Sequence, residues 1–191
     1  MPYNAPPNTA AWRHVEARDG FEVAYFHRRA DGYRIEGGTT AVEDGQTWIV
    51  TYSIDLDSRW TTRSVQATNC TAAGTHRTEV ESDGAGNWRV NGELAPHLTG
   101  CLDVDLESSA MTNTLPIHRL DPPAGARVSA PAAYIRALDL RVDRLEQDYT
   151  RVGDDGRHYD YLSPAFDFSC RLTYDASGLV LDYPGIATRT T

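Results

Sequence analysis

Hydrophobic and polar residues alternate in short runs along most of this chain, and turn-forming pairs separate the runs. Such alternation places hydrophobic side chains on one face of a β-strand and polar side chains on the other. The runs are rich in Val, Ile, Thr, Tyr and Trp, which favour strands. Asp-Gly or Asn-Gly pairs beside such runs predict tight turns, and they occur at Asp19-Gly20, Asp31-Gly32, Asp44-Gly45 and Asn91-Gly92. The pattern therefore predicts a mainly antiparallel β protein.

One segment, residues 138–152, is ambiguous between helix and strand. In a helix, its hydrophobic residues, among them Leu138 and Leu145, would share a face. The same segment also alternates with the period of a strand, at Leu138, Leu140 and Val142. No strand–helix–strand pattern occurs elsewhere, which argues against a parallel sheet or a Rossmann-type fold.

The chain divides into a short arm and one domain. Residues 1–11 are rich in proline and polar side chains, and they predict a flexible N-terminal arm. Residues 12–191 have the length of a single domain with a substantial core. A domain with so many strands must close or roll up to protect its sheet edges. We therefore expect an all-β domain with little helix.

Residues 100–120 contain ionisable side chains within a sequence that otherwise has the hydrophobic residues of a protein core. The segment predicts two strands joined by a polar loop, with Asp103 and Asp105 alternating with hydrophobic residues on the first. On the second, His118 and Arg119 point to opposite faces, so one of them points inward whichever face is buried. A buried ionisable group is costly unless it is paired. The segment therefore predicts either an interior polar site or a cross-strand Asp–Arg pair of structural value.

Three stretches of this chain carry a resemblance to a known family. They are GCLDVDLES at 100–108, TNTLPIHRL at 112–120 and DASGLVLDYPG at 175–185. Single residues outside them also fit the family pattern: Trp12, Glu22, Trp60, Arg63, Gln147, Tyr149, Tyr159, Tyr161 and Phe166. With these features the chain resembles the bacterial putative glycolipid-binding family, formerly a domain of unknown function. Two departures fall inside the signature: Ser109, Ala110 and Met111 replace Thr-Pro-Phe, and His118 replaces an arginine.

The resemblance implies both a fold and a class of ligand. The implied fold is an antiparallel sheet wound into an open, barrel-like spiral β-roll. The family name implies a glycolipid-like ligand, and a rolled sheet can enclose an apolar cavity that would hold it. This step from fold to ligand is an analogy.

Composition and charge exclude several classes of function. A formal net charge of −9 and a pI near 5.0 argue against binding to nucleic acid or to an anionic membrane through basic residues. All 18 basic residues are arginines, so a Schiff-base lysine and a P-loop lysine are excluded. The sequence contains no run that could span a bilayer, and its N-terminus lacks the pattern of a secretory signal. We therefore expect a cytoplasmic protein.

The cysteines and histidines give no sign of a metal site or a cofactor. The three cysteines lie far apart and the histidines lack metal-binding spacing, so we expect neither disulfides nor a metal. Asp103, Asp105 and Glu107 share one strand face, where they form either an acid–base cluster or a solvated surface.

The candidate ligand-binding residues are polar groups of the signature and aromatic or basic residues of the strands. They are Asn113, His118, Arg119, Arg63, Trp48, Trp60, Trp88 and Tyr149. His118 can donate, accept or shuttle a proton, whereas its alternative role is a satisfied core or surface histidine. The tryptophans can line a pocket or simply fill the core, and Asn113 can contact a ligand or cap a turn.

Three functions are compatible with these residues. The first is a cytoplasmic protein that binds a lipid-like or glycolipid-like amphiphile in an internal cavity. The second is a small-molecule enzyme, a cyclase or isomerase of secondary metabolism, with His118 and either Asp103 or Asp105 as acid–base groups. The third is a structural or interaction module. The sequence does not indicate the oligomeric state.

Overall fold

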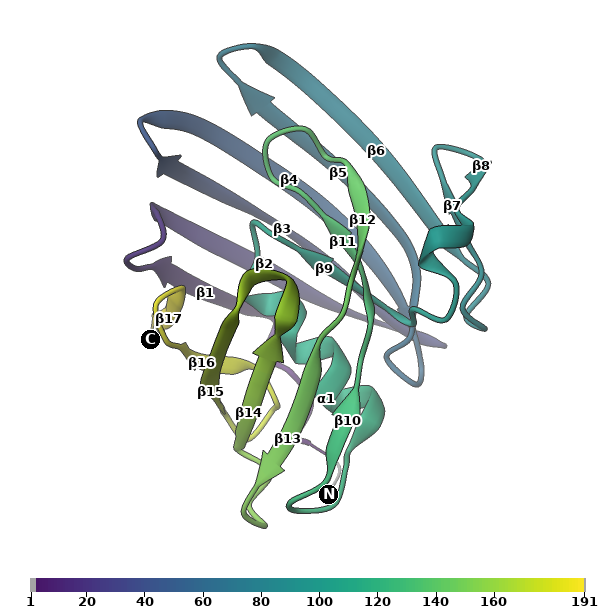
Figure 1. Cartoon of the computed structure of the whole chain (residues 1–191), viewed down its shortest axis with the longest axis vertical. Helices are drawn as coiled ribbons and strands as arrows, with labels where there is room; N and C mark the ends of the chain where they lie inside the picture. The colour runs from purple at the N-terminus through teal and green to yellow at the C-terminus, as the bar shows by residue number, and fades with distance from the viewer. Residues whose placement is uncertain (1–2, 191) are drawn as a thin grey trace.

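Hairpin connections build one large antiparallel sheet from most of the chain. A computed structural model describes residues 3–190, and fourteen of the strands in this range form that sheet (Figure 1). Its spatial order is β10-β13-β14-β15-β16-β17-β1-β2-β3-β4-β5-β6-β7-β8. The strands are β1 (Thr9–His14), β2 (Asp19–Arg29), β3 (Gly32–Glu43), β4 (Gln46–Asp57), β5 (Thr62–Thr71), β6 (Gly74–Ser82), β7 (Trp88–Val90), β8 (Glu93–Leu94), β10 (Arg127–Ser129), β13 (Asp148–Val152), β14 (His158–Ser163), β15 (Phe168–Tyr174), β16 (Val180–Tyr183) and β17 (Ala187–Thr190).

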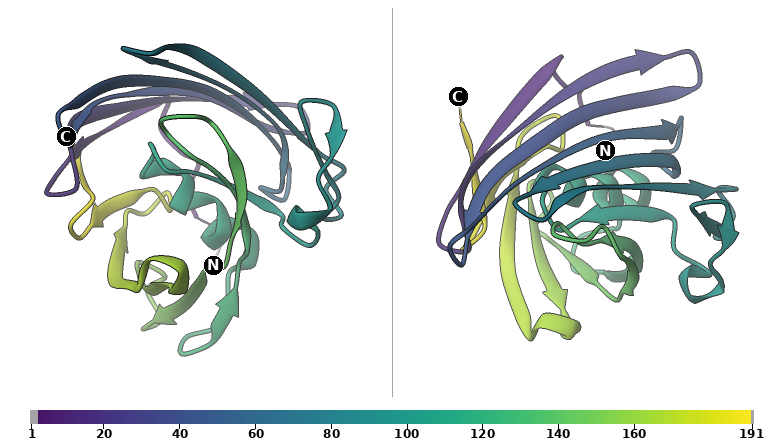
Figure 2. Two further views of the ribbon diagram at one scale, coloured as in Figure 1. Left: turned by 45° about the horizontal axis from the view of Figure 1, so that its top comes forward. Right: turned by 90° about the horizontal axis from the view of Figure 1, so that it is seen from above.

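The sheet curls without closing into a barrel. β1 pairs with β17, so the two ends of the chain meet in the middle of the sheet, while β10 and β8 form its edges. Figure 2 shows the part of the sheet formed by β1 to β6 arching over the teal and green segments that follow β8 in the chain. The expected all-β fold, with an open antiparallel sheet and little helix, is confirmed.

Two predicted hairpin turns have the backbone that their residues favour. Asp44 and Gly45 have φ angles of 49° and 76°, and Asn91 and Gly92 have 51° and 82°. Positive φ at both central residues is the mark of the turn that matches the twist of a hairpin. Within the ambiguous segment at residues 138–152, residues 142–145 and 148–152 form strands and no helix occurs, whereas Leu138 and Leu140 of the alternating pattern lie in the turn region before the first of these strands.

A small second sheet lies in the hollow of the large one (Figures 1 and 2). It contains β9 (Asp103–Leu106), β11 (Ala132–Ile135) and β12 (Val142–Leu145). β9 pairs in parallel with β11, which pairs antiparallel with β12. All four residues of β9 are buried, so the alternative in which Asp103 and Asp105 belong to a solvated surface is wrong. β9 is held to the large sheet by the Val104 amide, which donates to the Thr62 hydroxyl of β5 at 3.1 Å.

The predicted strand over residues 115–120 is wrong, because the segment forms the helix α1 (Thr114–Leu120). Pro116 occupies the third helical position, in the first turn, where a missing N–H costs no hydrogen bond. The helix ends at Asp121, which has a left-handed conformation, and Pro122 follows. Two turns of helix are too short to display a helical period, so the alternating residues resembled a strand.

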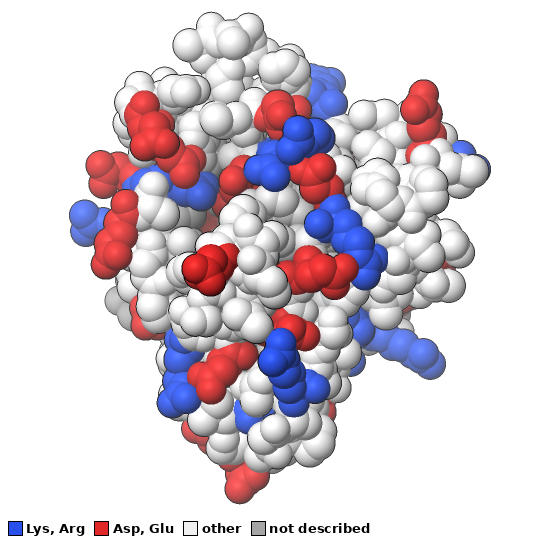
Figure 3. All heavy atoms as spheres, in the orientation of Figure 1, with Lys and Arg blue, Asp and Glu red and all other residues white. Residues whose placement is uncertain are grey.

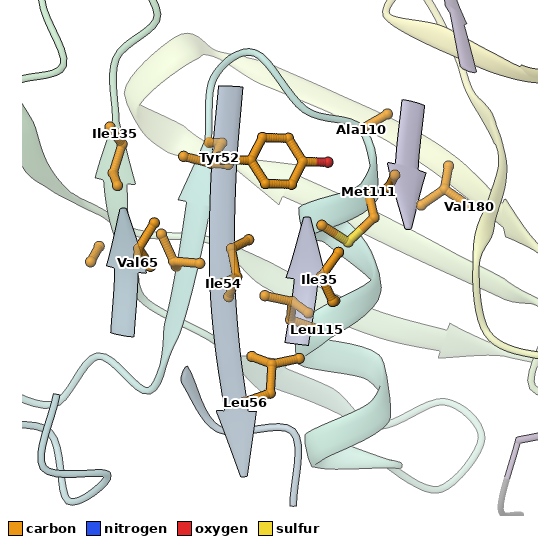
Figure 4. Close-up of a cluster of buried hydrophobic side chains, with 14 of the residues drawn as sticks. Ile35, Tyr52, Ile54, Leu56, Val65, Ala110, Met111, Leu115, Ile135 and Val180 are labelled. Carbon is orange, nitrogen blue, oxygen red and sulfur yellow. The ribbon is translucent and has the colours of Figure 1, made fainter. Parts of the chain in front are cut away.

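Helix α1 fills the hollow together with the short 3-10 helix η2 (Met111–Asn113) that precedes it. Figure 4 shows Met111 and Leu115 directed toward Ile35 of β3 and Ile54 of β4. All four side chains are almost fully buried. Two further 3-10 helices, η1 (Pro96–Leu98) and η3 (Pro164–Phe166), lie at the ends of strands.

The N-terminal arm is shorter than the sequence predicted. β1 begins at Thr9, before the expected boundary at residue 11. The Tyr3 hydroxyl lies 2.9 Å from that of Tyr159, and the Asn4 amide donates to the Ala176 carbonyl at 3.0 Å. Residues 1 and 2 of the arm lie outside the described residues.

Candidate functional site

Arg119 of α1 pairs with the buried Asp103 of β9. Its Nε donates to Oδ1 at 3.0 Å and its Nη2 to Oδ2 at 2.6 Å, in a bidentate arrangement. Burial raises the pKa of Asp103, and the hydrogen bonds and charge of Arg119 oppose that rise. The pair fastens the helix to the small sheet. An Asp–Arg pair of structural value was one of the predicted alternatives, but it joins a helix to a strand and not two strands.

His118 is held in an aromatic stack. Its ring lies parallel to that of Trp60 at a centroid distance of 3.8 Å, and Tyr3 lies 4.7 Å away. Nε2 donates to the Ser177 carbonyl at 2.9 Å, because a carbonyl oxygen can only accept. Gly178 has a φ of +72°, and a Cβ there would lie 2.5 Å from Nε2 of His118. Burial lowers the pKa of His118 to about 4, so the imidazole is neutral near pH 7.

Three of the predicted residues, Trp60, His118 and Arg119, line one surface depression of about 590 Å³. The two polar side chains already bond to Ser177 and Asp103. The hydrogen bonds of His118 and Arg119 therefore have a structural role, which is to hold α1 against its neighbours.

The other predicted aromatic and basic residues lie elsewhere. Trp48 packs beneath the guanidinium of Arg18, in a separate small cluster of buried residues. Trp88 is buried in the main core, where its Nε1 donates to the Cys101 carbonyl at 2.8 Å. Arg63 is exposed, with its guanidinium against Gly84. The three tryptophans therefore do not share a pocket.

A different pocket, the Asp105 pocket, collects buried polar groups and aromatic rings. It has a volume of about 220 Å³ and lies between the small sheet and strands β14 to β16. Its polar lining is Arg18, Asp105, Glu107, Ser109, Asn113 and Ser163. Its aromatic lining is Tyr134, Tyr161, Phe166, Phe168 and Tyr183, and Leu106, Leu145 and Ile186 complete it.

Asp105 is the principal ionisable group of this pocket. It is 7% exposed, and the Thr112 hydroxyl donates to its Oδ1 at 3.0 Å. Burial raises its pKa to about 7, Thr112 opposes the rise, and the charges of Glu107 and Asp103 add to it. Among the described residues no arginine pairs with Asp105. The carboxyl group therefore exchanges its proton close to neutral pH.

A network of side chains behind the pocket fixes Asn113. The Tyr149 hydroxyl donates to Oδ1 of Asn113 at 2.8 Å, and the Tyr174 hydroxyl donates to its backbone carbonyl at 3.1 Å. The Tyr161 hydroxyl donates to Oε1 of Gln147 at 3.0 Å. These bonds use the acceptors of Asn113 and leave its amide nitrogen as a donor beside the pocket.

Glu22 anchors the segment that carries Ser109 into the pocket. This fully buried side chain accepts hydrogen bonds from the hydroxyls of Tyr52 and Ser109 and from the amides of Ala110 and Met111. Burial raises the pKa of Glu22, and the four donors oppose that rise. From the sequence, Glu22 was only a match to the family. The strand pattern gave no clear signal that Glu22 is buried, because its face carries Ala24 and Phe26 while the opposite face carries Phe21 and Tyr25.

Comparison with known proteins identifies the family. Residues 9–189 match the family described as Putative glycolipid-binding. The chain belongs to this family. Among solved structures, it is similar to a DUF1089 family protein from Pseudomonas aeruginosa, with 28% identity and a TM-score of 0.79, over 100% of this chain and 96% of that one.

A second solved structure shares the fold at lower similarity. It is a beta-barrel-like protein of the DUF1849 domain from Brucella abortus, with 13% identity and a TM-score of 0.50. The match covers 98% of this chain and 95% of that one. No curated protein matches the chain.

The pocket combines residues that sequence analysis named with residues that it missed. Asp105 and Asn113 were candidates, and Tyr149 lies directly behind them. Tyr134, Ser163 and Phe168 were missed. The sequence offered little indication of their role, because each lies in a strand whose other hydrophobic residues fill the core, and the pattern does not distinguish pocket residues from core residues.

Neither a metal centre nor a membrane helix occurs among residues 3–190. No group of three or more His, Cys, Asp or Glu side chains in this range could hold a metal ion. None of the helices in it has the length and hydropathy of a membrane span.

Proposed function

We propose that this protein binds a lipid-like or glycolipid-like amphiphile and that the Asp105 pocket receives its polar head. The observation that carries the proposal is the combination of Asp105, Asn113 and Ser163 with five aromatic rings in one pocket. Ligand sites have this composition, in which apolar walls surround a few fixed polar groups. The family's description supports the same class of ligand.

The size of the pocket suits only part of such a ligand. Its volume of about 220 Å³ is below the roughly 300–1,000 Å³ that is usual for sites enclosing a whole small molecule. Phe166 lines the pocket and is 50% exposed, so it lies at the mouth. A polar head can enter while the apolar tail remains against this rim.

The acid–base alternative has less support. His118 and Asp105 line different pockets, and Nε2 of His118 is committed to Ser177. Asp103, the other candidate acid, is committed to Arg119. Binding requires no proton transfer between these groups. The cytoplasmic location stays a prediction from the sequence.

The test is a calorimetric titration with n-octyl-β-D-glucoside below its micelle concentration. We expect saturable binding to the wild-type protein. Phe166→Ala removes the ring at the mouth of the pocket and should weaken binding on the order of 3- to 10-fold. The Phe166 side chain is half exposed, so the Phe166→Ala variant should fold normally.

Phe21→Ala is the matched control, because Phe21 is a similarly exposed phenylalanine on β2, away from the pocket. It should bind the glucoside as the wild type does. The proposal is wrong if the wild type binds no glucoside, or if both variants bind it equally well.

A further inference from the structure

The charges around the Asp105 pocket are unbalanced. Asp105 and Glu107 both line it, and the sequence contains no lysine that could reach them. Arg18 is the cation in the lining. Its Nη1 donates to the Glu107 carbonyl at 3.1 Å, its Nη2 lies 3.5 Å from Oε1 of Glu43, and its guanidinium lies over Trp48. Both terminal nitrogens of Arg18 are therefore committed to other groups, and among the described residues Asp105 has no cationic partner.

Three polar atoms of the lining residues also lack partners within the described part of the chain, and one of them is the buried Nε of Arg18. Oδ2 of Asp105 makes no hydrogen bond among the described residues, since Thr112 bonds to the other oxygen. Ser163 is 1% exposed, and its hydroxyl has no hydrogen-bond partner of good geometry. Buried polar groups are normally satisfied, so unpaired groups around a pocket indicate a site for polar atoms of a ligand.

Aromatic rings line the same pocket as these polar atoms. The rings of Tyr161, Phe168 and Tyr183 contact one another at centroid distances of 5.9–6.3 Å. Tyr134 and Phe166 form a second pair at 5.7 Å. The faces of aromatic rings attract cations, and a group of rings beside a carboxylate is the arrangement that recognises ammonium groups.

We infer that the polar head held in the Asp105 pocket carries a positively charged amino or quaternary ammonium group, which pairs with Asp105. This inference rests on the proposed function, because it specifies the head of the same amphiphile. A neutral head would leave the buried carboxylate without a counter-charge, which is unfavourable. A cation neutralises the carboxylate and is attracted by the rings at the same time.

The test compares n-octylammonium with n-octanol, which differ only in the head group. Titrations are made at pH 8 in 150 mM salt, where the amine is charged and long-range attraction to the acidic protein is screened. We expect the ammonium to bind about 10- to 100-fold more tightly than the alcohol, the range for a charge-assisted hydrogen bond. Asp105→Asn should abolish this preference and leave the affinity for octanol unchanged.

Asp31→Asn is the control for net charge. It removes the same unit of charge from an exposed turn, and the preference for ammonium should persist. The Asp105→Asn side chain keeps the shape of the original and can still accept from Thr112, so it should fold. Thermal unfolding and the octanol titration both check this.

The outcomes separate the two proposals. Equal binding of ammonium and alcohol, or a preference that survives Asp105→Asn, overturns the cation inference. If octyl glucoside nevertheless binds in a manner that Phe166→Ala weakens, the proposed function stands alone. If the wild type binds no octyl glucoside, or if Phe166→Ala and Phe21→Ala bind it equally well, the proposed function fails and the cation inference fails with it.

Discussion

Asp103 and Asp105 lie two residues apart on β9, yet their surroundings give them different roles. Asp103 receives two hydrogen bonds from Arg119, whereas Asp105 receives one from Thr112 and borders a pocket. From the sequence, both are candidate site residues, and a pair between one of them and Arg119 was one of the predicted alternatives. The sequence could not decide between them, because the choice depends on the direction of α1, which the alternating pattern did not predict.

Breaking the Asp103–Arg119 pair should destabilise the protein. Arg119→Leu leaves a buried carboxylate without its partner and should lower the free energy of unfolding by about 3 kcal/mol or more at pH 7. Chemical denaturation with urea measures this. Adding Asp103→Asn should recover part of the loss, because the unpaired charge is then absent.

The effect should also depend on pH in a defined direction. The folded-state pKa of Asp103 is raised, and it rises further when Arg119 is removed. The protonated carboxyl then favours the folded state, and this contribution is lost as pH rises through the folded-state pKa. The deficit of Arg119→Leu should therefore shrink as pH falls toward 4. A change within about 0.5 kcal/mol at pH 7, typical of surface positions, would contradict the buried pair.

At the scale of the element, α1 and η2 determine what fills the hollow of the sheet. α1 has only seven residues, and a helix this short is not stable by itself. Burial of Met111, Leu115 and Ile117 against the sheet stabilises it instead. Local sequence could not reveal this, because the contacts come from β3 and β4, which end at Glu43 and Asp57, far earlier in the chain.

A single truncation should test the packing of α1. Leu115→Ala removes a fully buried side chain and should lower the free energy of unfolding by about 2–5 kcal/mol. Leu138→Ala is the control, since this side chain is 42% exposed and its loss should change stability by less than about 0.5 kcal/mol. Equal, small effects of the two variants in urea denaturation would show that α1 is not packed as described.

At the scale of the whole molecule, pairing between the chain ends completes the sheet. β1 lies between β17 and β2, and Nε1 of Trp12 donates to the Val180 carbonyl at 2.7 Å. A strand at the start of the chain therefore occupies a central position in the sheet. Figure 3 shows acidic and basic side chains interspersed on one face of this molecule.

Hydrogen exchange should show that β1 is a central strand. We expect its amides to exchange as slowly as those of β3 and β4, because both neighbours of β1 are paired. The short edge strands β8 and β10 should exchange fastest. Mass spectrometry of exchanged peptides measures this order. Rapid exchange throughout β1 would show that the chain ends are not paired.

The sequence by itself determined the antiparallel β class, many of the turns and the family. These depend on local preferences, such as positive φ at Asp44-Gly45, or on the signature around TNTLPIHRL. The tertiary structure alone decided which face of each strand is buried. Alternation in β2 would place Phe21 and Tyr25 inside, but both are exposed, and the face with Glu22 is buried.

The tertiary structure also decided the helical state of residues 114–120 and the assembly of the Asp105 pocket. The pocket joins Asp105 with rings from Tyr134 to Tyr183, which come from separate strands and loops. Such contacts depend on how distant segments pack, and burial overrides weak local preferences. Local pattern therefore sufficed for the strands and turns, whereas only packing brought the polar groups and rings into one site.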